Sequence, residues 1–206
     1  MRKLLAVLSF ATIAATSNAA LTVQDVFTSD EVVWFGLDFT HAKMVGEFHI
    51  KPRLLPSWNM LVITEHKKYD IRRAFHKTSV FNDLIVVEKR NAEVDCDKLM
   101  VLNDNKLSKE TIDEIISDYK GGEKKDGLGL VFIVEQFSRI SKRGSFYVTF
   151  FDIGSRKVLL AERMEGRPGG FAVRNYWACA IKNVLNQIEE TAYAKWKGLY
   201  SSPAKR

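Results

Sequence analysis

Residues 128–137, LGLVFIVEQF, most restrict what this chain can fold into. In an extended conformation their apolar side chains would lie on both faces, so both faces of this strand must be covered. Two further apolar stretches, at 145–153 and 158–164, follow after the short polar segments SRISKRG and GSRK. Strands joined by short polar turns pair with their neighbours along the chain. We therefore predict a three-strand antiparallel meander.

Residues 31–39, EVVWFGLDF, predict another strand that is covered on both faces. Strict alternation gives it one face of Val33, Phe35, Leu37 and Phe39, and an opposite face of Val32, Trp34, Gly36 and Asp38. The short apolar runs at 84–87 and 98–102 are further strand candidates. Strands of this kind belong inside a sheet that helices cover.

The clearest helix signal covers residues 109–120. Ser108 suits its N-cap, where a side-chain oxygen accepts a bond from a free backbone N–H. Leu107 and Ile112 can form a hydrophobic staple across this end, and the two glycines at 121–122 end the helix.

Three further helices complete the prediction. One covers residues 58–68 with Ser57 at its N-cap, a short one covers 71–77 after Asp70, and a long amphipathic one runs from about 173 to 195. The order is strand, helices, one or two strands, helix, meander and helix. This order predicts an α/β (α+β) fold with a mixed sheet, a C-terminal antiparallel three-strand meander and a long C-terminal helix.

The start of the chain has the layout of a secretory signal peptide. Two basic residues precede an apolar run at 4–15, and Ser17 and Ala19 suit the small-residue positions of a cleavage site. The run is too short to span a bilayer. We therefore predict a signal peptide over residues 1–20, one globular domain over 21–206, and export to the periplasm or the cell surface.

Charge and hydropathy limit the partners of the mature chain. No later stretch approaches the roughly 18 consecutive apolar residues of a membrane span, so we expect no transmembrane segment. The formal net charge of +6 includes Arg2 and Lys3 of the leader, and the remaining excess of basic residues is small and evenly spread. This balance argues against nucleic acid as a partner. We expect instead a protein or small ligand of the cell envelope.

The histidines and cysteines do not form a metal-site pattern. No two of the histidines (His41, His49, His66 and His76) are four residues apart, and neither Cys96 nor Cys179 lies in a C-x-x-C pair. We therefore expect no metal and no cofactor. The nucleophile motif G-x-S-x-G is absent, and we assign no catalytic residue. In an oxidising compartment Cys96 and Cys179 could form a disulfide, or they could remain apart.

Buried carboxylates offer one alternative function. Asp38 and Glu135 lie on two predicted strands of the sheet, and a pair of carboxyl groups can carry out glycoside hydrolysis if their separation is right. An envelope hydrolase with a non-standard carboxylate site is therefore one hypothesis.

The glycine-rich segment GRPGGFAVRNYW, residues 166–177, offers another. It enters the long helix, where free backbone N–H groups can bind an anion or nucleotide with help from Arg167, Gly169, Gly170 and Arg174. The segment matches no nucleotide-binding motif. The structural alternative is a tight turn with positive φ at its glycines, in which Phe171 fills a place in the core.

Residues 151–185, FDIGSRKVLLAERMEGRPGGFAVRNYWACAIKNVL, resemble the C-terminal half of uncharacterised exported proteins of Gram-negative bacteria. In those proteins a strand hairpin leads through a Gly-Gly-Phe turn into an Arg-Asn-Tyr-Trp helix. More distantly, the element order is similar to the envelope accessory domains of the penicillin-binding-protein-activator and curli-secretion lipoproteins. The first cysteine of this chain is Cys96, so it lacks their lipidation cysteine. The resemblance implies a non-enzymatic binding or envelope-accessory domain and supplies no catalytic residue.

Overall fold

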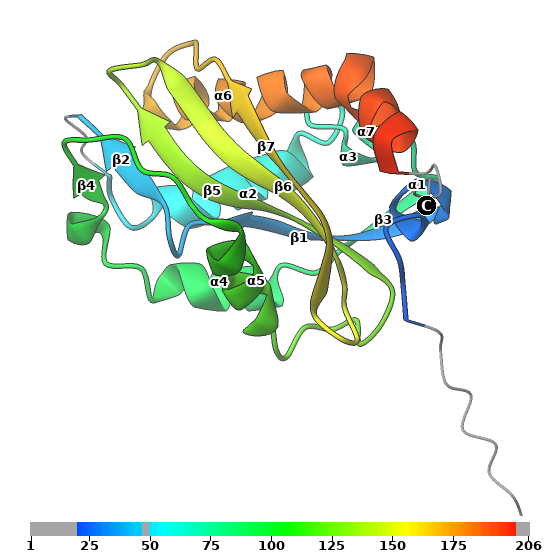
Figure 1. Ribbon diagram of the computed structural model, residues 1–206. Coiled ribbons are helices and arrows are strands. Elements are labelled where there is room, and N and C mark those ends of the chain that lie inside the picture. Colours follow the sequence, from blue (N-terminus) through cyan, green and yellow to red (C-terminus); the bar gives the residue numbers. More distant parts are fainter. Residues whose placement is uncertain (1–19, 47–49, 201–206) are drawn as a thin grey trace, which may run out of the picture.

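The computed structural model describes residues 20–46 and 50–200 (Figure 1). All but the last residue of the predicted signal peptide therefore lies outside the described residues. Seven strands form one mixed sheet. They are β1 (Glu31–Asp38), β2 (Lys43–Val45), β3 (Ser79–Asn82), β4 (Met100–Val101), β5 (Leu128–Ser138), β6 (Arg143–Asp152) and β7 (Lys157–Gly166).

The long strand β5 organises the sheet. On one side it pairs with the antiparallel strand β6, which pairs in turn with β7, so the predicted meander is confirmed. On its other side β5 pairs in parallel first with β1 and then, further along, with β2. β3 and β4 extend the sheet in parallel beyond β1 and β2. The sheet is therefore mixed, as the sequence predicts.

Helices cover both faces of the sheet (Figure 1). The helices are α1 (Asp25–Thr28), α2 (Leu54–Thr64), α3 (Ile71–Ala74), α4 (Ile85–Ala92), α5 (Lys109–Ser117), α6 (Val173–Gln187) and α7 (Tyr193–Tyr200). Apolar residues of α2 and α6 join one core cluster, and those of α4 and α5 join a second cluster on the opposite face. Because β1 and β5 contribute to both clusters, their apolar residues are buried on both sides.

Local capping signals place two helices. Ser108 Oγ accepts a bond from the backbone N–H of Thr111, so the predicted N-cap of α5 is confirmed, although the helix ends at Ser117. Asp70 caps α3 in the same way by accepting from Arg73 N. The predicted N-cap at Ser57 is wrong. Helix α2 begins at Leu54, and Pro56 is accommodated in the first turn, where backbone N–H groups have no partner within the helix.

The C-terminal helix is longer than predicted. α6 continues through a π-helical turn, Ile188–Ala192, into α7. No helix among residues 20–46 and 50–200 has the length and apolarity needed to cross a membrane.

The strand predicted at residues 84–87 is wrong, because this segment begins α4. Its β-branched residues favour a strand locally, but Val86 and Val87 lie on the buried side of a helix that exposes Glu88 and Lys89. Ile85 is about half exposed. The strand predicted at 98–102 shrinks to Met100–Val101, after a 3₁₀ turn over Cys96–Lys98.

The predicted alternation along β1 also fails at one residue. The pairing of β1 with β5 shifts between Trp34 and Gly36, where Gly36 has a φ of +101°. This bulge moves Leu37 and Phe39 onto the face that Val32 and Trp34 occupy. It also turns Asp38, the last residue of β1, toward the face that α4 and α5 cover.

Candidate functional site

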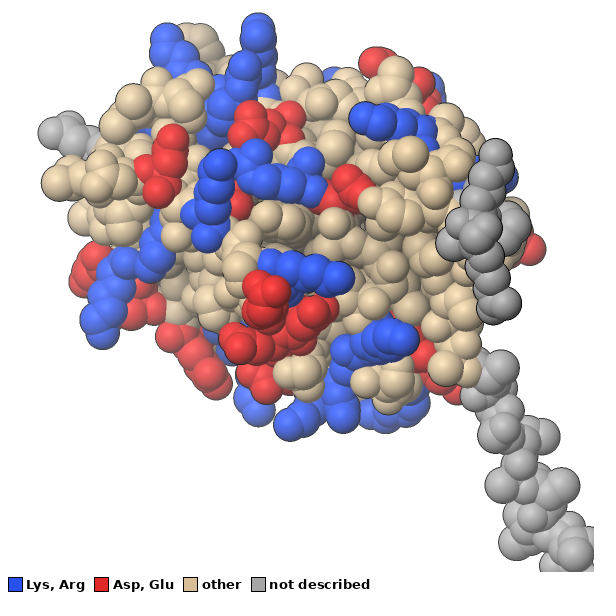
Figure 2. Space-filling model, in the orientation of Figure 1, with Lys and Arg blue, Asp and Glu red and all other residues tan. Residues whose placement is uncertain are grey.

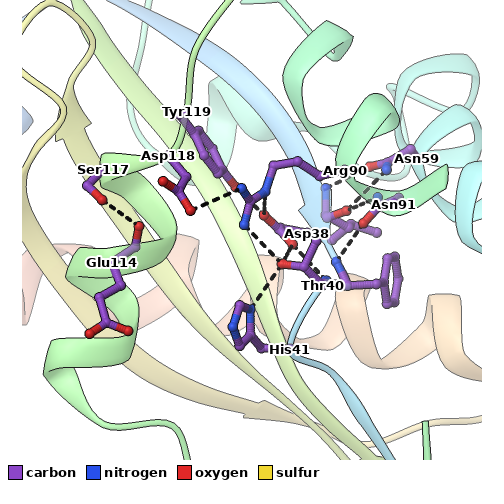
Figure 3. A network of polar contacts seen from close by, with 12 residues as sticks. Asp38, Thr40, His41, Asn59, Arg90, Asn91, Glu114, Ser117, Asp118 and Tyr119 are labelled. Carbon is purple, nitrogen blue, oxygen red and sulfur yellow. Dashed lines mark hydrogen bonds and ion pairs between the residues drawn. The ribbon is translucent and has the colours of Figure 1, made fainter. Parts of the chain in front are cut away.

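A buried polar network lies where β1 ends, around Asp38 (Figure 3). The Asp38 side chain has no exposed surface. Its Oδ1 accepts bonds from the backbone N–H of Thr40, at 2.8 Å, and from the Thr40 hydroxyl. Its Oδ2 accepts from Tyr119 Oη at 2.7 Å and from Arg90 Nε at 3.3 Å. Both carboxylate oxygens are therefore fully engaged within the protein.

Arg90 reaches Asp38 from α4, and Tyr119 reaches it from the segment that follows α5 (Figure 3). The Arg90 guanidinium also donates to Thr40 Oγ1 and lies over the Tyr119 ring. Burial, together with the neighbouring carboxylate of Asp38, raises the pKa of Tyr119 well above its usual value. Tyr119 therefore stays a neutral hydrogen-bond donor. The network joins β1 to two helices that are distant from it in sequence.

Two buried asparagines replace sheet pairing at the same point. Asn59 binds both the N–H and the C=O of Leu37, and Asn91 donates to Leu37 O while accepting from Phe39 N. Pairing between β1 and β3 ends at Trp34 and Asn82, so beyond Trp34 this edge of β1 has no strand partner, while Leu37 still pairs with β5 on the other side. Gly36 makes the arrangement sterically possible, because a Cβ there would lie 2.6 Å from Asn59 Oδ1.

A cavity of about 370 Å³ opens beside the network, and Thr40 and Arg90 form part of its wall. Its charged lining residues are of both signs: Lys43, Arg90 and Lys98 against Glu93 and Asp95. The carboxyl ends of parallel strands are the usual place for ligands in α/β sheets. The mixed charge of this cavity selects for neither an anion nor a cation.

Glu135, the other carboxylate of the hydrolase hypothesis, is bound separately. It lies at a bulge in β5, is fully buried, and pairs with Arg163 at 2.6 Å. Its Oε1 accepts the backbone N–H of Leu107. Asp38 and Glu135 therefore have different arginine partners, and each carboxylate is engaged in an ion pair of its own. Neither is arranged as a free general acid.

Charged side chains of both signs are interspersed over the face of the molecule in Figure 2. Among the described residues, no group of three or more His, Cys, Asp or Glu side chains could hold a metal ion. Cys96 and Cys179 are both half-buried free thiols in the structure. A disulfide between them therefore stays a prediction.

The glycine-rich segment links β7 to α6 and borders a second cavity, of about 430 Å³. Of the four predicted ligand residues, Gly170 lines this cavity, beside Arg139 from the turn between β5 and β6. Gly170 has a φ of +91°, as a tight turn requires. Two of the segment's backbone N–H groups have internal partners, since Arg167 N donates to Asn183 Oδ1 and Gly169 N donates to Tyr176 O.

The structure also places Arg174, a predicted ligand residue, and Phe171, which the alternative prediction assigns to the core. Arg174 Nε donates to the neighbouring Asn175 side chain, and the Arg174 carbonyl accepts from Trp58 Nε1. The expectation that Phe171 fills a place in the core is wrong, because its side chain is 94% exposed. The turn closes through Gly170 and Ala172, both with positive φ, and it leaves Phe171 on the outside.

Phe171 belongs to a larger group of exposed apolar side chains at one end of the sheet. Strand register places the ends of β2, β4 and β5 side by side, followed by the start of β6 and the end of β7. We call the segments at this end the distal loops; they are residues 102–106, 139–143, which include the first residue of β6, and 167–174, which include the first two residues of α6. They expose Leu102 by 86% and Ile140 by 71%, in addition to Phe171.

Sequence reasoning missed this surface, although one signal for it was present. Ile140 is the only apolar residue in the turn segment SRISKRG, where a core role is not expected. The distal loops also contain six basic residues, Lys106, Arg139, Lys142, Arg143, Arg167 and Arg174, against one acidic residue, Asp104. Two adjacent distal loops share the 430 Å³ cavity, which Arg139 and Gly170 both line.

Comparison with known proteins adds little to this description. No family model matches the chain. No curated protein matches its sequence either. Among solved structures, the crystal structure of the lipoprotein GNA1162 from Neisseria meningitidis has 14% sequence identity and a TM-score of 0.34, over 79% of this chain and 98% of that chain. A likeness at this TM-score supports neither a common fold nor a common function.

Proposed function

We propose that this chain is an exported binding or accessory domain of the cell envelope, without catalysis of its own, and that the distal loops are its binding surface. The observation that carries the proposal is the exposure of Leu102, Ile140 and Phe171 at one end of the sheet. Single exposed apolar residues are normal on a protein surface, so it is their occurrence on three segments at the same end of the sheet that supports a binding site here. The leader-like residues 1–20 support export.

Two features make binding a better explanation than hydrolysis. Asp38 and Glu135 are buried and each is ion-paired with its own arginine, whereas a general acid needs a proton and access to the substrate. The cavity beside Asp38 is lined by side chains of both charges and lacks an obvious nucleophile. The anion-binding alternative at residues 166–174 is weakened by the internal bonds of two of its N–H groups.

Site-specific photo-cross-linking in the cells that make this protein tests the proposal. A photoreactive amino acid is placed at Phe171, and, as a matched control, at Leu199. Leu199 is 62% exposed on α7, at the opposite end of the molecule (Figure 1). We expect the protein in the envelope fraction without its leader, and cross-links to an envelope component from position 171 but not from 199. Equal yields at the two positions, or a protein retained in the cytosol, would contradict the proposal.

A further inference from the structure

The distal loops combine protruding apolar side chains with a strong excess of positive charge. Phe171, Ile140 and Leu102 stand on three separate segments. Ile140 directly follows Arg139, whereas the basic residues nearest to Phe171 and Leu102 are three or four positions away in sequence. Arg143 also pairs with Glu165, at 3.7 Å. Apolar side chains that project between lysines and arginines are typical of surfaces that bind the interface of an anionic membrane.

We propose that the distal loops dock the protein onto a lipid bilayer that carries anionic phospholipids, with Phe171 entering the interfacial region. This inference rests on the proposed function and names the chemistry of the binding partner. The six basic residues are complementary to anionic headgroups. Phe171 is the most exposed large apolar residue of the described chain, so it is placed to enter first.

A bilayer fits this surface better than an acidic protein does. A stable protein interface needs a continuous, well-packed patch of about 800 Å² on each partner. The distal loops instead present exposed apolar side chains on three separate segments, two of which border a cavity. A lipid interface accepts such side chains one by one, because it does not require a complementary fixed shape.

Binding to vesicles tests the proposal on the processed protein purified from the cells that accumulate it. Mass spectrometry must first confirm that the apolar leader is absent, because residues 4–15 would bind vesicles by themselves. Vesicles of phosphatidylglycerol and phosphatidylethanolamine are compared with vesicles of phosphatidylcholine alone. We expect binding to the anionic vesicles only, and weaker binding as the salt concentration rises.

Variants assign the binding to the distal loops. Phe171→Ser should weaken binding about tenfold, since it removes one large apolar side chain from the interface. Removing charge with Lys142→Gln and Arg167→Gln should weaken it about fivefold each. Leu199→Ser and Lys195→Gln on α7 are the matched controls and should leave the affinity unchanged. Equal effects of the distal and control variants would overturn the proposal.

A fluorescent variant gives a direct readout of insertion. The native tryptophans Trp34, Trp58, Trp177 and Trp196 are all buried, so a tryptophan introduced by Phe171→Trp would be the one exposed indole among the described residues. Its emission should shift to shorter wavelength on anionic vesicles, and brominated lipids should quench it. An unchanged spectrum would overturn the proposal. If vesicles are not bound while position 171 still cross-links to an envelope protein, the lipid proposal fails and the proposed binding function stands.

Discussion

Replacing Arg90 with methionine tests the reasoning about the network at the end of β1. The substitution keeps most of the aliphatic volume and removes the cation that faces the buried Asp38 carboxylate. The Arg90 side chain is itself only 19% exposed. After the change, Asp38 keeps its bonds from Thr40 and Tyr119 and loses its counter-charge.

The size of the effect follows from these contacts. Removing one partner of a buried ion pair costs about 3–5 kcal/mol, because the other charge stays buried without compensation. The remaining hydrogen bonds to Asp38 lower this figure, and loss of the cation–π contact with Tyr119 adds about 0.5–1 kcal/mol. The 3.9 Å pair of Arg90 with the exposed Asp118 contributes little. We expect Arg90→Met to lower the free energy of unfolding by about 3 kcal/mol.

Urea unfolding followed by the fluorescence of the buried tryptophans measures this loss. Lys98→Met is the control, because it removes an exposed ion pair with Asp95 and should cost under about 0.5 kcal/mol. The double variant Asp38→Asn/Arg90→Met should recover about 1–2 kcal/mol relative to Arg90→Met, since no buried charge remains. A wild-type stability for Arg90→Met would refute the reasoning. It would mean that Asp38 does not depend on its counter-charge, and would revive it as a catalytic candidate.

Three further predictions concern single positions. Gly166→Ala should lower the free energy of unfolding in urea by about 3 kcal/mol, because the added Cβ would overlap the Ala180 carbonyl of α6. The control Gly198→Ala adds a Cβ in open space on α7 and should not destabilise the protein. An equal loss in both variants would contradict the packing argument. Asn91→Ala should cost about 1–3 kcal/mol, since the Phe39 N–H loses its partner and the Leu37 carbonyl keeps only its bond from Asn59; a change in the urea midpoint within error would argue against it. Burial lowers the pKa of Lys77 to about 8 from its usual 10.5, so between these pH values the unfolded chain binds more protons and wild-type stability should rise with pH relative to Lys77→Met. Solvent screening of the ammonium reduces this rise to about 1–2 kcal/mol, and parallel pH profiles of the two melting temperatures would contradict it.

The elements that could be predicted from sequence depend on neighbouring residues. The N-caps Ser108 and Asp70 act on backbone N–H groups three residues away, and the meander requires only two short polar turns. Helix α4 was missed because the apolar run at 84–87 fits a strand and a helix equally well, and only the packing of Val86 and Val87 against the sheet decides between them.

The partners in the candidate site could not be predicted for a related reason. Asp38 was identified as a candidate, but Arg90 is 52 positions and Tyr119 is 81 positions further along the chain. The bulge at Gly36 directs Asp38 toward these two residues. Asn59 of α2 accepts a hydrogen bond from the Leu37 N–H beside the bulge, so the local backbone conformation involves a residue that is also distant in sequence. Isolated carboxylates in a sequence therefore identify buried polar positions without showing whether they are catalytic or structural.

Exposed apolar residues give a different kind of information from buried polar ones. The Asp38 and Glu135 networks are sufficiently explained by the architecture, because each joins a strand to elements that would otherwise pack less firmly. Phe171, Ile140 and Leu102 gain no such stability, because their side chains remain in water and bury little surface on folding. Single exposed apolar residues are common on folded proteins, so exposure alone does not assign these three side chains a role. Their position at one end of the sheet, among six basic residues, is what the proposed contact with an anionic membrane would explain.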